Sequence, residues 1–302
     1  MMRLLVHGLR RSGIAVVVLL VSLGASLAWA ADLKEIQARG EIRHLGIRYA
    51  NFVTGEGDGF DVDLVRGFAS EIGVRYTLVY TDFYNVLRDL LGHDVVNRGG
   101  TVTLEGDYPI RGDMIATGFT VLPWREQVVL YSEPTFPSQV LLVARASSAY
   151  SPIKGSPDLA HDIAETRGLI GTHSLLVMER TCLDPGNYDL KGKGLDLRAY
   201  ARSTNLNEMV PALLNGEAEF TLLDVPDAIL DLQKWAGKIK VLGPISPEQK
   251  LAAAFPKTSP ELLAAFNRYL HRVRADGTYN ALVMKYYSGV RRFFPDFFVS
   301  WK

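Results

Sequence analysis

Cysteine is almost absent from this chain, since Cys182 is the single cysteine in 302 residues. One thiol cannot form an internal disulfide, so a disulfide-stapled scaffold is excluded. An excess of basic residues is also absent, because 33 Lys and Arg balance 33 Asp and Glu. A nucleic-acid partner would require a basic face, and this composition gives no support to one. We interpret Cys182 as a packed thiol rather than a nucleophile.

Apolar runs long enough to cross a membrane are lacking as well. Residues 14–27 are apolar but fall short of the ~20 residues that a spanning helix needs, and no charged stop-transfer flank follows. Basic residues precede this run and Ala28-Trp29-Ala30 ends it, which is the pattern of a secretory signal peptide. We therefore predict a signal peptide over residues 1–30, cut after Ala30. The mature chain then carries 30 basic and 33 acidic side chains, a net charge of −3.

Catalytic and metal-binding motifs are not found. The mature chain has five histidines, and they are scattered without the HExxH-like spacing of a zinc site. No nucleophile motif accompanies them. We predict no metal, no cofactor and no catalytic residue.

Strands and helices alternate through most of the chain. Residues 42–47 and 74–80 read as strands, and a helix with Asp61 as its N-cap lies between them. In the second half, a short strand at Leu169-Ile170 is predicted to end in a loop at Thr172, followed by a helix through Met178. A strand over residues 217–223 delivers Asp224 to its end. This alternation predicts an α/β fold with parallel sheets covered by helices.

Two segments interrupt that pattern. Residues 93–111 resemble a small hairpin inserted between a helix and a strand, which is either a surface ornament or a specificity loop, and we interpret it as an ornament. Residues 293–301 contain five aromatic side chains. We interpret this tail as tied to the body of the protein rather than as a partner site.

The stretch over residues 112–136 carries the strongest chemical signal. A buried strand there ends in a Gly/Thr loop, and Pro123 suits the first position of a helix whose first turn holds Arg125. A cation in a first turn opposes the helix dipole, at a cost of ~0.3–1 kcal/mol. A guanidinium beside such a loop suits recognition of a small carboxylate. The alternative is a surface arginine paired with Glu126 or Glu133.

Four stretches resemble the family 3 extracellular solute-binding proteins, the periplasmic receptors for polar amino acids that serve ABC transporters. They are GFDVDLVRGFASEIG, GDMIATGFTVLPWREQVVLYSEPTF, ALLNGEAEFTLLDVPDAIL and AAFPKTSPELLAAFNRYLHRVRADGTYNALVMKYYSG. The resemblance implies a type II periplasmic binding protein: two α/β lobes, each a mostly parallel sheet flanked by helices, joined by a two-strand hinge. It places lobe I at residues 31–138 plus 251–302 and lobe II at residues 139–250.

The resemblance also implies roles for particular residues. Arg125 matches the arginine that holds the ligand α-carboxylate, and Asp224 matches the acid that takes the α-ammonium; Asp224 has a second interpretation, as the N-cap of the helix that follows. The matching loop and stacking positions are Gly118, Thr120, Thr172, and Phe52 or Tyr49. Leu122 departs from the family, which usually has a Thr or Ser cap there.

The expected function is capture of a small zwitterion or carboxylate by a periplasmic, monomeric receptor that delivers it to an inner-membrane ABC permease. Two alternatives use the same fold. One is an enzyme resembling cyclohexadienyl or arogenate dehydratase, and the other is a ligand-sensing module such as those that precede lytic transglycosylase domains. The chain ends shortly after the binding module, so we expect no transglycosylase domain.

Overall fold

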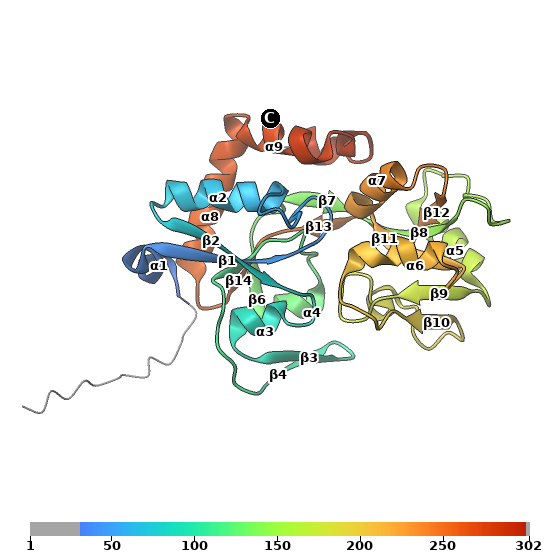
Figure 1. Cartoon of the computed structure of the whole chain (residues 1–302), viewed down its shortest axis with the longest axis horizontal. Coiled ribbons are helices and arrows are strands. Elements are labelled where there is room, and N and C mark those ends of the chain that lie inside the picture. The colour runs from blue at the N-terminus through green and yellow to red at the C-terminus, as the bar shows by residue number, and fades with distance from the viewer. Residues whose placement is uncertain (1–30, 300–302) are drawn as a thin grey trace, which may run out of the picture.

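The computed structural model describes residues 31–299, so the predicted signal peptide, its cleavage site and Trp301 lie outside the described residues. Two five-stranded sheets, each with helices around it, form two lobes that lie side by side (Figure 1). None of the helices within residues 31–299 is long and apolar enough to cross a membrane.

The first lobe takes its elements from both ends of the described chain. From the N-terminal side come α1 (Leu33–Arg39), β1 (Glu41–Ile47), α2 (Phe60–Glu71), β2 (Arg75–Thr81), α3 (Val86–Leu91), β3 (Asp94–Arg98), β4 (Thr101–Glu105), β5 (Met114–Ile115), α4 (Pro123–Glu126) and β6 (Val129–Tyr131). From the C-terminal side come β14 (Ala254–Pro256), α8 (Pro260–Ala275), α9 (Thr278–Tyr287), the 3-10 turn η3 (Val290–Arg292) and α10 (Pro295–Val299).

The second lobe is one continuous stretch. It contains β8 (Val140–Arg145), α5 (Leu159–Ile170), β9 (Ser174–Val177), the 3-10 turn η1 (Pro185–Tyr188), β10 (Asp196–Ala199), the 3-10 turn η2 (Leu206–Glu208), α6 (Met209–Leu214), β11 (Phe220–Asp224), α7 (Val225–Lys234) and β12 (Ile239–Pro244). Between the lobes, β7 (Phe136–Ser138) and β13 (Gln249–Leu251) pair antiparallel as a two-stranded hinge.

Each sheet has one strand that runs against the other four. The orders are β2-β1-β5-β14-β6 and β10-β9-β11-β8-β12, and the reversed strands are β14 and β8. Each of these strands directly follows a hinge strand, so it enters its lobe from the side at which its neighbours end. The mostly parallel sheets that the alternation predicts are therefore present, and the two crossings account for the exceptions.

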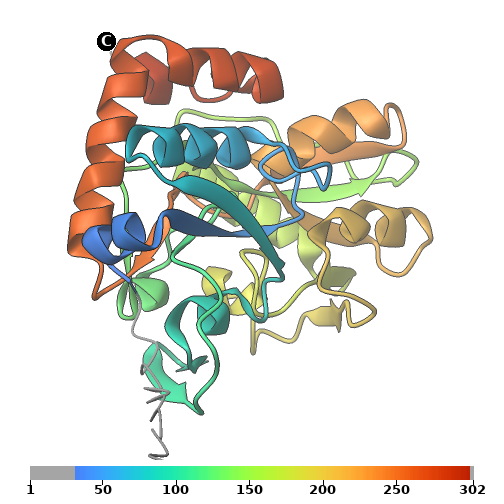
Figure 2. The same ribbon diagram turned by 60° about the vertical axis from the view of Figure 1, so that its left-hand side comes forward.

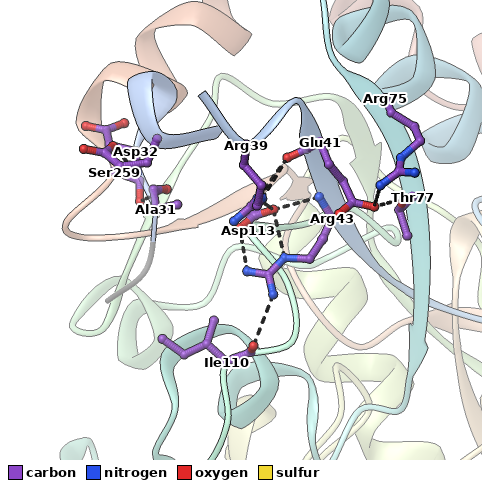
Figure 3. A network of polar contacts seen from close by, with 11 residues as sticks. Ala31, Asp32, Arg39, Glu41, Arg43, Arg75, Thr77, Ile110, Asp113 and Ser259 are labelled. Carbon is purple, nitrogen blue, oxygen red and sulfur yellow. Dashed lines mark hydrogen bonds and ion pairs between the residues drawn. The ribbon is translucent and has the colours of Figure 1, made fainter. Parts of the chain in front are cut away.

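The carboxyl ends of β1 and β5 are positioned by a buried acid at the other end of β5. Asp113 is fully buried and accepts hydrogen bonds from the Arg43 backbone N–H and from the Arg39 and Arg43 guanidinium groups (Figure 3). The two arginines are partly exposed, so water solvates the side of each guanidinium that the carboxylate leaves free. Because β5 has only two residues, this anchor fixes where the following loop at residues 117–120 begins.

The C-terminal helices complete the core of lobe I. Helix α8 runs along the side of the lobe and α9 lies across α2 (Figure 2). Phe68 of α2 packs edge-on against Phe266 of α8 at 5.2 Å between ring centroids, and burying two such rings stabilises the fold by about 3–6 kcal/mol. In the tail, Phe294 is buried and the Phe298 ring lies against Phe136, whereas Phe293 is exposed. The described part of the tail is therefore held on the body.

The sequence prediction for residues 169–178 was wrong. Leu169 and Ile170 end helix α5 rather than forming a strand, and the segment predicted as a helix is strand β9. A short apolar run fits either element, and only length and context distinguish them. Here Leu175, Leu176 and Val177 are completely or almost completely buried between β10 and β11. A strand at this place forms backbone hydrogen bonds with neighbours on both sides.

Candidate ligand-binding site

Arg125 lies in the inter-lobe region and is not a surface residue. It sits in α4, which starts at Pro123 and has no side-chain cap at Leu122, as the missing Thr or Ser predicts. Its side chain is only 2% exposed. The alternative of a surface pair with Glu133 is wrong, because Glu133 pairs with His271 and Arg274.

The Arg125 guanidinium has no anionic partner within residues 31–299. Its Nη1 donates to the Thr120 carbonyl at 2.9 Å, and its central carbon lies 4.0 Å from the centre of the Phe119 ring. The Nε atom is buried without a hydrogen-bond acceptor. A buried cation that lacks a counter-charge costs several kcal/mol, so this guanidinium presents unused donors to an anion.

Asp224 ends β11 and is equally buried, at 1% exposure. Its side chain caps α7 by accepting the Asp227 N–H at 3.2 Å, so the N-cap interpretation is correct as far as it goes. Burial raises the pKa of this carboxyl to about 6, and the nearby Tyr49 hydroxyl, the Asp227 N–H and the Cys182 thiol oppose that rise. Asp224 makes no ion pair within the described part of the chain, and its second oxygen, Oδ2, accepts only from the Cys182 thiol at 3.8 Å.

Cys182 of lobe II contacts Asp224, and its pKa is affected by both Asp224 and Arg125. Its thiol lies 3.8 Å from the Asp224 Oδ2 atom. Burial raises the pKa of the Cys182 thiol well above its usual range, Asp224 raises it further, and Arg125 lowers it. Both Arg125 and Asp224 therefore lie close enough to one thiol to act on it. Arg125 and Asp224 are thus buried in different lobes, and both affect the pKa of this one thiol.

Tyr49 follows β1 and lies at the same junction. It is completely buried, and its ring contacts Phe83 edge-on at 5.6 Å. Its hydroxyl is near enough to Asp224 to lower the pKa of that carboxyl, yet it makes no hydrogen bond of good geometry to any residue in 31–299. An unpartnered buried hydroxyl costs about 1–3 kcal/mol, so this group is a further unused donor in the site.

Phe52 lies elsewhere, inside the core of lobe I. Its ring is completely buried among Phe60, Phe136 and Tyr287, with centroid distances of 5.1–6.1 Å. Because protein side chains surround the ring, no face is left for a ligand. Of the two aromatic candidates after β1, only Tyr49 reaches the inter-lobe charges.

Gly118 and Thr120 shape the loop that leads to Arg125. Gly118 has φ +60°, its N–H donates to Asp61 Oδ2 at 2.6 Å, and a Cβ there would approach the Phe52 ring to 2.4 Å. Asp61 is therefore not the predicted N-cap, because α2 begins at Phe60 and the Asp61 carboxyl is buried against this loop. Thr120 is buried, and its carbonyl accepts from both Arg125 and Tyr131.

Thr172 lies at the wrong end of its strand for a ligand contact. It precedes β9, is exposed, and therefore sits at the edge of the sheet opposite to Asp224, because β9 and β11 run parallel. The carboxyl end of β9 delivers residues 178–182 instead. Thr181 and Cys182 thus occupy the place that the sequence assigned to Thr172, and the incorrect assignment of the strand concealed them.

The lobes touch directly across this region. The Ala50 N–H donates to the Asn207 side chain at 3.2 Å, and Arg180 Nη2 donates to the Tyr84 carbonyl at 3.2 Å. These bonds join lobe I to lobe II outside the hinge, so the structure has a closed arrangement.

A cavity of about 1080 Å³ lies between the lobes; Arg125, Asp224, Tyr49 and Cys182 are not among the residues that line it. Lobe I lines it with α3, α4 and the β3–β4 hairpin, and lobe II lines it with the loop over residues 180–191. The hairpin residues in its wall include Asp94, Asn97 and Glu105, so part of the segment interpreted as an ornament borders this cavity. Within residues 31–299, no group of three or more His, Cys, Asp or Glu is arranged to hold a metal ion.

Comparison with known protein families shows which family the chain matches. The model of bacterial extracellular solute-binding proteins, family 3, matches residues 110–289. The chain is 28% identical over 291 residues to the membrane-bound lytic murein transglycosylase F of Desulfosudis oleivorans. The matched region covers 93% of this chain but only 57% of that protein. It is 25% identical over 236 residues to the lysine/arginine/ornithine-binding periplasmic protein of Escherichia coli, covering 76% of this chain and 78% of that protein.

Solved structures share the fold. A variant of the arginine-binding protein ArgBP from T. maritima superposes with a TM-score of 0.66 at 22% identity, covering 85% of this chain and 99% of that one. An ancestral amino-acid-binding protein, described as a precursor of cyclohexadienyl dehydratase, gives a TM-score of 0.64 at 23% identity, covering 84% and 99%. At these identities the likeness establishes the two-lobed periplasmic-binding-protein fold.

Proposed function

Because this chain belongs to the bacterial extracellular solute-binding proteins of family 3, we propose that it captures a small zwitterionic amino acid between its lobes. Arg125 binds the α-carboxylate and Asp224 binds the α-ammonium. The observation that supports this assignment is the pair itself: two buried groups of opposite charge, one from each lobe, which both affect the pKa of the Cys182 thiol and have no counter-charge within the described chain.

Ligand capture depends on closure of the hinge. In the closed arrangement Arg125 and Asp224 are both removed from water, which costs several kcal/mol unless each finds a partner. A zwitterion supplies both partners, so it binds the closed form more tightly and shifts the population toward it. Residues 31–138 plus 251–299 and residues 139–250 move as the two bodies, and β7 and β13 bend between them.

The receptor works in the periplasm as a monomer and delivers its ligand to an ABC permease in the inner membrane. The family, the pattern of the first thirty residues and the periplasmic E. coli relative support this part of the proposal. The similarity to transglycosylase F over 93% of this chain favours a second role for the same capture step, in which the closed lobes signal to an attached or separate enzyme.

Binding takes place without chemistry. His44 does not suggest a catalytic base: it is buried, its Nδ1 lies 2.9 Å from the Tyr76 hydroxyl, and burial lowers its pKa to about 4. Its Nε2 bonds the Ala116 carbonyl, so both ring nitrogens are engaged. Incubation with prephenate or arogenate, followed by analysis for an aromatic product, tests the dehydratase alternative directly.

The experiment that tests the proposal is a thermal-shift screen of free amino acids, beginning with lysine, arginine and ornithine. A hit is then titrated by calorimetry against the wild type and Arg125→Ala. We expect the variant to lose at least a hundredfold in affinity, because it removes a charge-assisted contact in a desolvated site. An affinity that survives the substitution would remove Arg125 from the site.

A further inference from the structure

Two hydrogen bonds join the lobes away from the hinge, and each involves a residue with an unusual backbone conformation. The Ala50 N–H donates to the Asn207 side chain at 3.2 Å, and Ala50 has φ +45°. The Arg180 side chain donates to the Tyr84 carbonyl at 3.2 Å, and Arg180 has φ +60°. Within the described chain, Asp189 is the one other non-glycine residue with a positive φ. A left-handed backbone is strained at such residues, and strain of this kind gathers where a protein switches between arrangements.

Lobe I holds the turn that contains Ala50. The next residue, Asn51, is bonded through its backbone and its side chain, because its N–H donates to the Tyr287 hydroxyl and its side chain donates to the Tyr286 carbonyl, each at 2.9 Å. Both partners belong to α9 of the same lobe. These bonds lie entirely within lobe I, so they hold the turn whether or not the lobes meet.

Lobe II holds Arg180 in a similar way. The Arg180 backbone N–H donates to the Asp184 Oδ2 atom at 2.8 Å, and the other oxygen of this carboxylate accepts the Gly186 N–H at 2.8 Å. The Arg180 side chain then reaches across to lobe I, where its guanidinium carbon lies 4.9 Å from the centre of the Tyr84 ring. A guanidinium over a ring is attracted by the ring quadrupole, in addition to the hydrogen bond that it donates.

We propose that these two contacts form a latch that closes the lobes on each other in a fraction of the protein molecules before any ligand arrives. The latch consists of Arg180 with Tyr84 and of Asn207 with Ala50. This inference rests on the hinge closure of the proposed function, but it does not depend on the identity of the ligand. Groups that are already oriented lose little freedom when they engage, so the latch favours closure at a low entropic cost.

The latch offsets part of the cost of closing. Closure removes Arg125 and Asp224 from water, which opposes it. Arg180 is exposed on its outer side, so its contact with the ring contributes about two- to fivefold to the ratio of closed to open molecules. Each hydrogen bond contributes roughly two- to tenfold. Loss of both contacts should therefore lower that ratio about tenfold or more.

The test is small-angle X-ray scattering on the full mature chain without ligand. We expect the double variant Arg180→Ala/Asn207→Ala to have a larger radius of gyration than the wild type, because it populates the open form. Tyr84→Leu, which removes the ring from the other lobe, should shift the radius in the same direction. Arg202→Ala is the matched control, since Arg202 is also an exposed arginine of lobe II over a tyrosine ring, at 5.0 Å from Tyr200 of its own lobe. It should leave the radius unchanged.

An equal radius of gyration in the wild type and the double variant would overturn the inference, and so would an equal increase in Arg202→Ala. If the double variant opens but no free amino acid binds to the wild type, the proposed function fails and the latch stands. If an amino acid binds through Arg125 and the double variant keeps the wild-type radius, only this inference fails.

Discussion

The Cys182 thiol lies 3.8 Å from the Asp224 Oδ2 atom. The Arg125 guanidinium also acts on this thiol, and it lowers the pKa of the thiol. Because burial and Asp224 both raise its pKa, the thiol stays protonated and uncharged. It therefore neutralises neither of the two charges. Their compensation must come from a ligand or from water, which makes the closed site energetically incomplete.

Replacement of Arg125 by Met should separate binding from stability. The unfolding free energy of the unliganded variant should equal that of the wild type or exceed it by up to about 1 kcal/mol, because a buried cation without an acid partner is removed. The thermal shift produced by an amino-acid ligand should disappear. Urea unfolding with and without ligand measures both effects. Arg268→Met, at an exposed position of α8, is the control and should retain the ligand-induced shift.

Tyr49→Phe removes a buried hydroxyl that has no good hydrogen bond in the described structure. We expect the unliganded protein to gain up to about 1 kcal/mol in unfolding free energy, because the cost of an unsatisfied polar group is removed. Ligand affinity should fall about tenfold, since a donor near Asp224 is lost. Urea unfolding and calorimetry on the same preparation check the two changes. A stability loss above 2 kcal/mol would show that the hydroxyl is satisfied in solution.

Gly118→Ala should destabilise lobe I by about 2–4 kcal/mol. The substitution combines a left-handed φ of +60° with a Cβ placed 2.4 Å from the Phe52 ring. Gly192→Ala is the matched control, because it has φ +76° with nothing within 4 Å and should cost only about 1 kcal/mol. Equal losses in urea unfolding for the two variants would contradict the predicted clash with Phe52.

Asp61 should make stability fall as the pH rises. Burial raises its folded-state pKa from the ordinary value of 3.8 to about 7, while the hydrogen bond from the Gly118 N–H opposes the rise. The folded protein therefore binds this proton more tightly than the unfolded chain, and its contribution is fully present below about pH 4 and lost as the pH rises through about 7. The largest slope is ~1.4 kcal/mol per pH unit.

The variant that isolates this effect is Asp61→Asn, which keeps an oxygen to accept the Gly118 N–H but does not titrate. Unfolding free energies of the wild type and the variant at pH 4.5, 6 and 7.5 should diverge in favour of the variant as the pH rises. Asp224 and Asp231 have raised pKa values in both proteins, and their contributions cancel in the difference. Parallel curves would show that Asp61 titrates normally.

Local sequence signals located much of the site. Pro123 at a helix start placed Arg125 in a first turn, and a strand ending before Pro226 placed Asp224 at a carboxyl end. The resemblance to a known family added the roles of both residues, and the alternation of strands and helices indicated mostly parallel sheets. These features depend on backbone geometry over a few neighbouring residues, which the sequence specifies directly.

Other parts of the site depend on contacts between distant segments. Leu175 to Val177 form a strand because β10 and β11 lie on both sides of them, so Thr172 falls at one edge of the sheet and Cys182 at the other. Tyr49 and Phe52 are equally aromatic and only three residues apart, yet tertiary packing encloses Phe52 in the core and turns Tyr49 toward Asp224. The hairpin over β3 and β4 becomes a cavity wall only because lobe II closes against it. The sequence by itself determined which charges the protein carries at its strand ends, whereas the packing of the two lobes decided which of them meet, since burial and proximity arise only when distant segments come together.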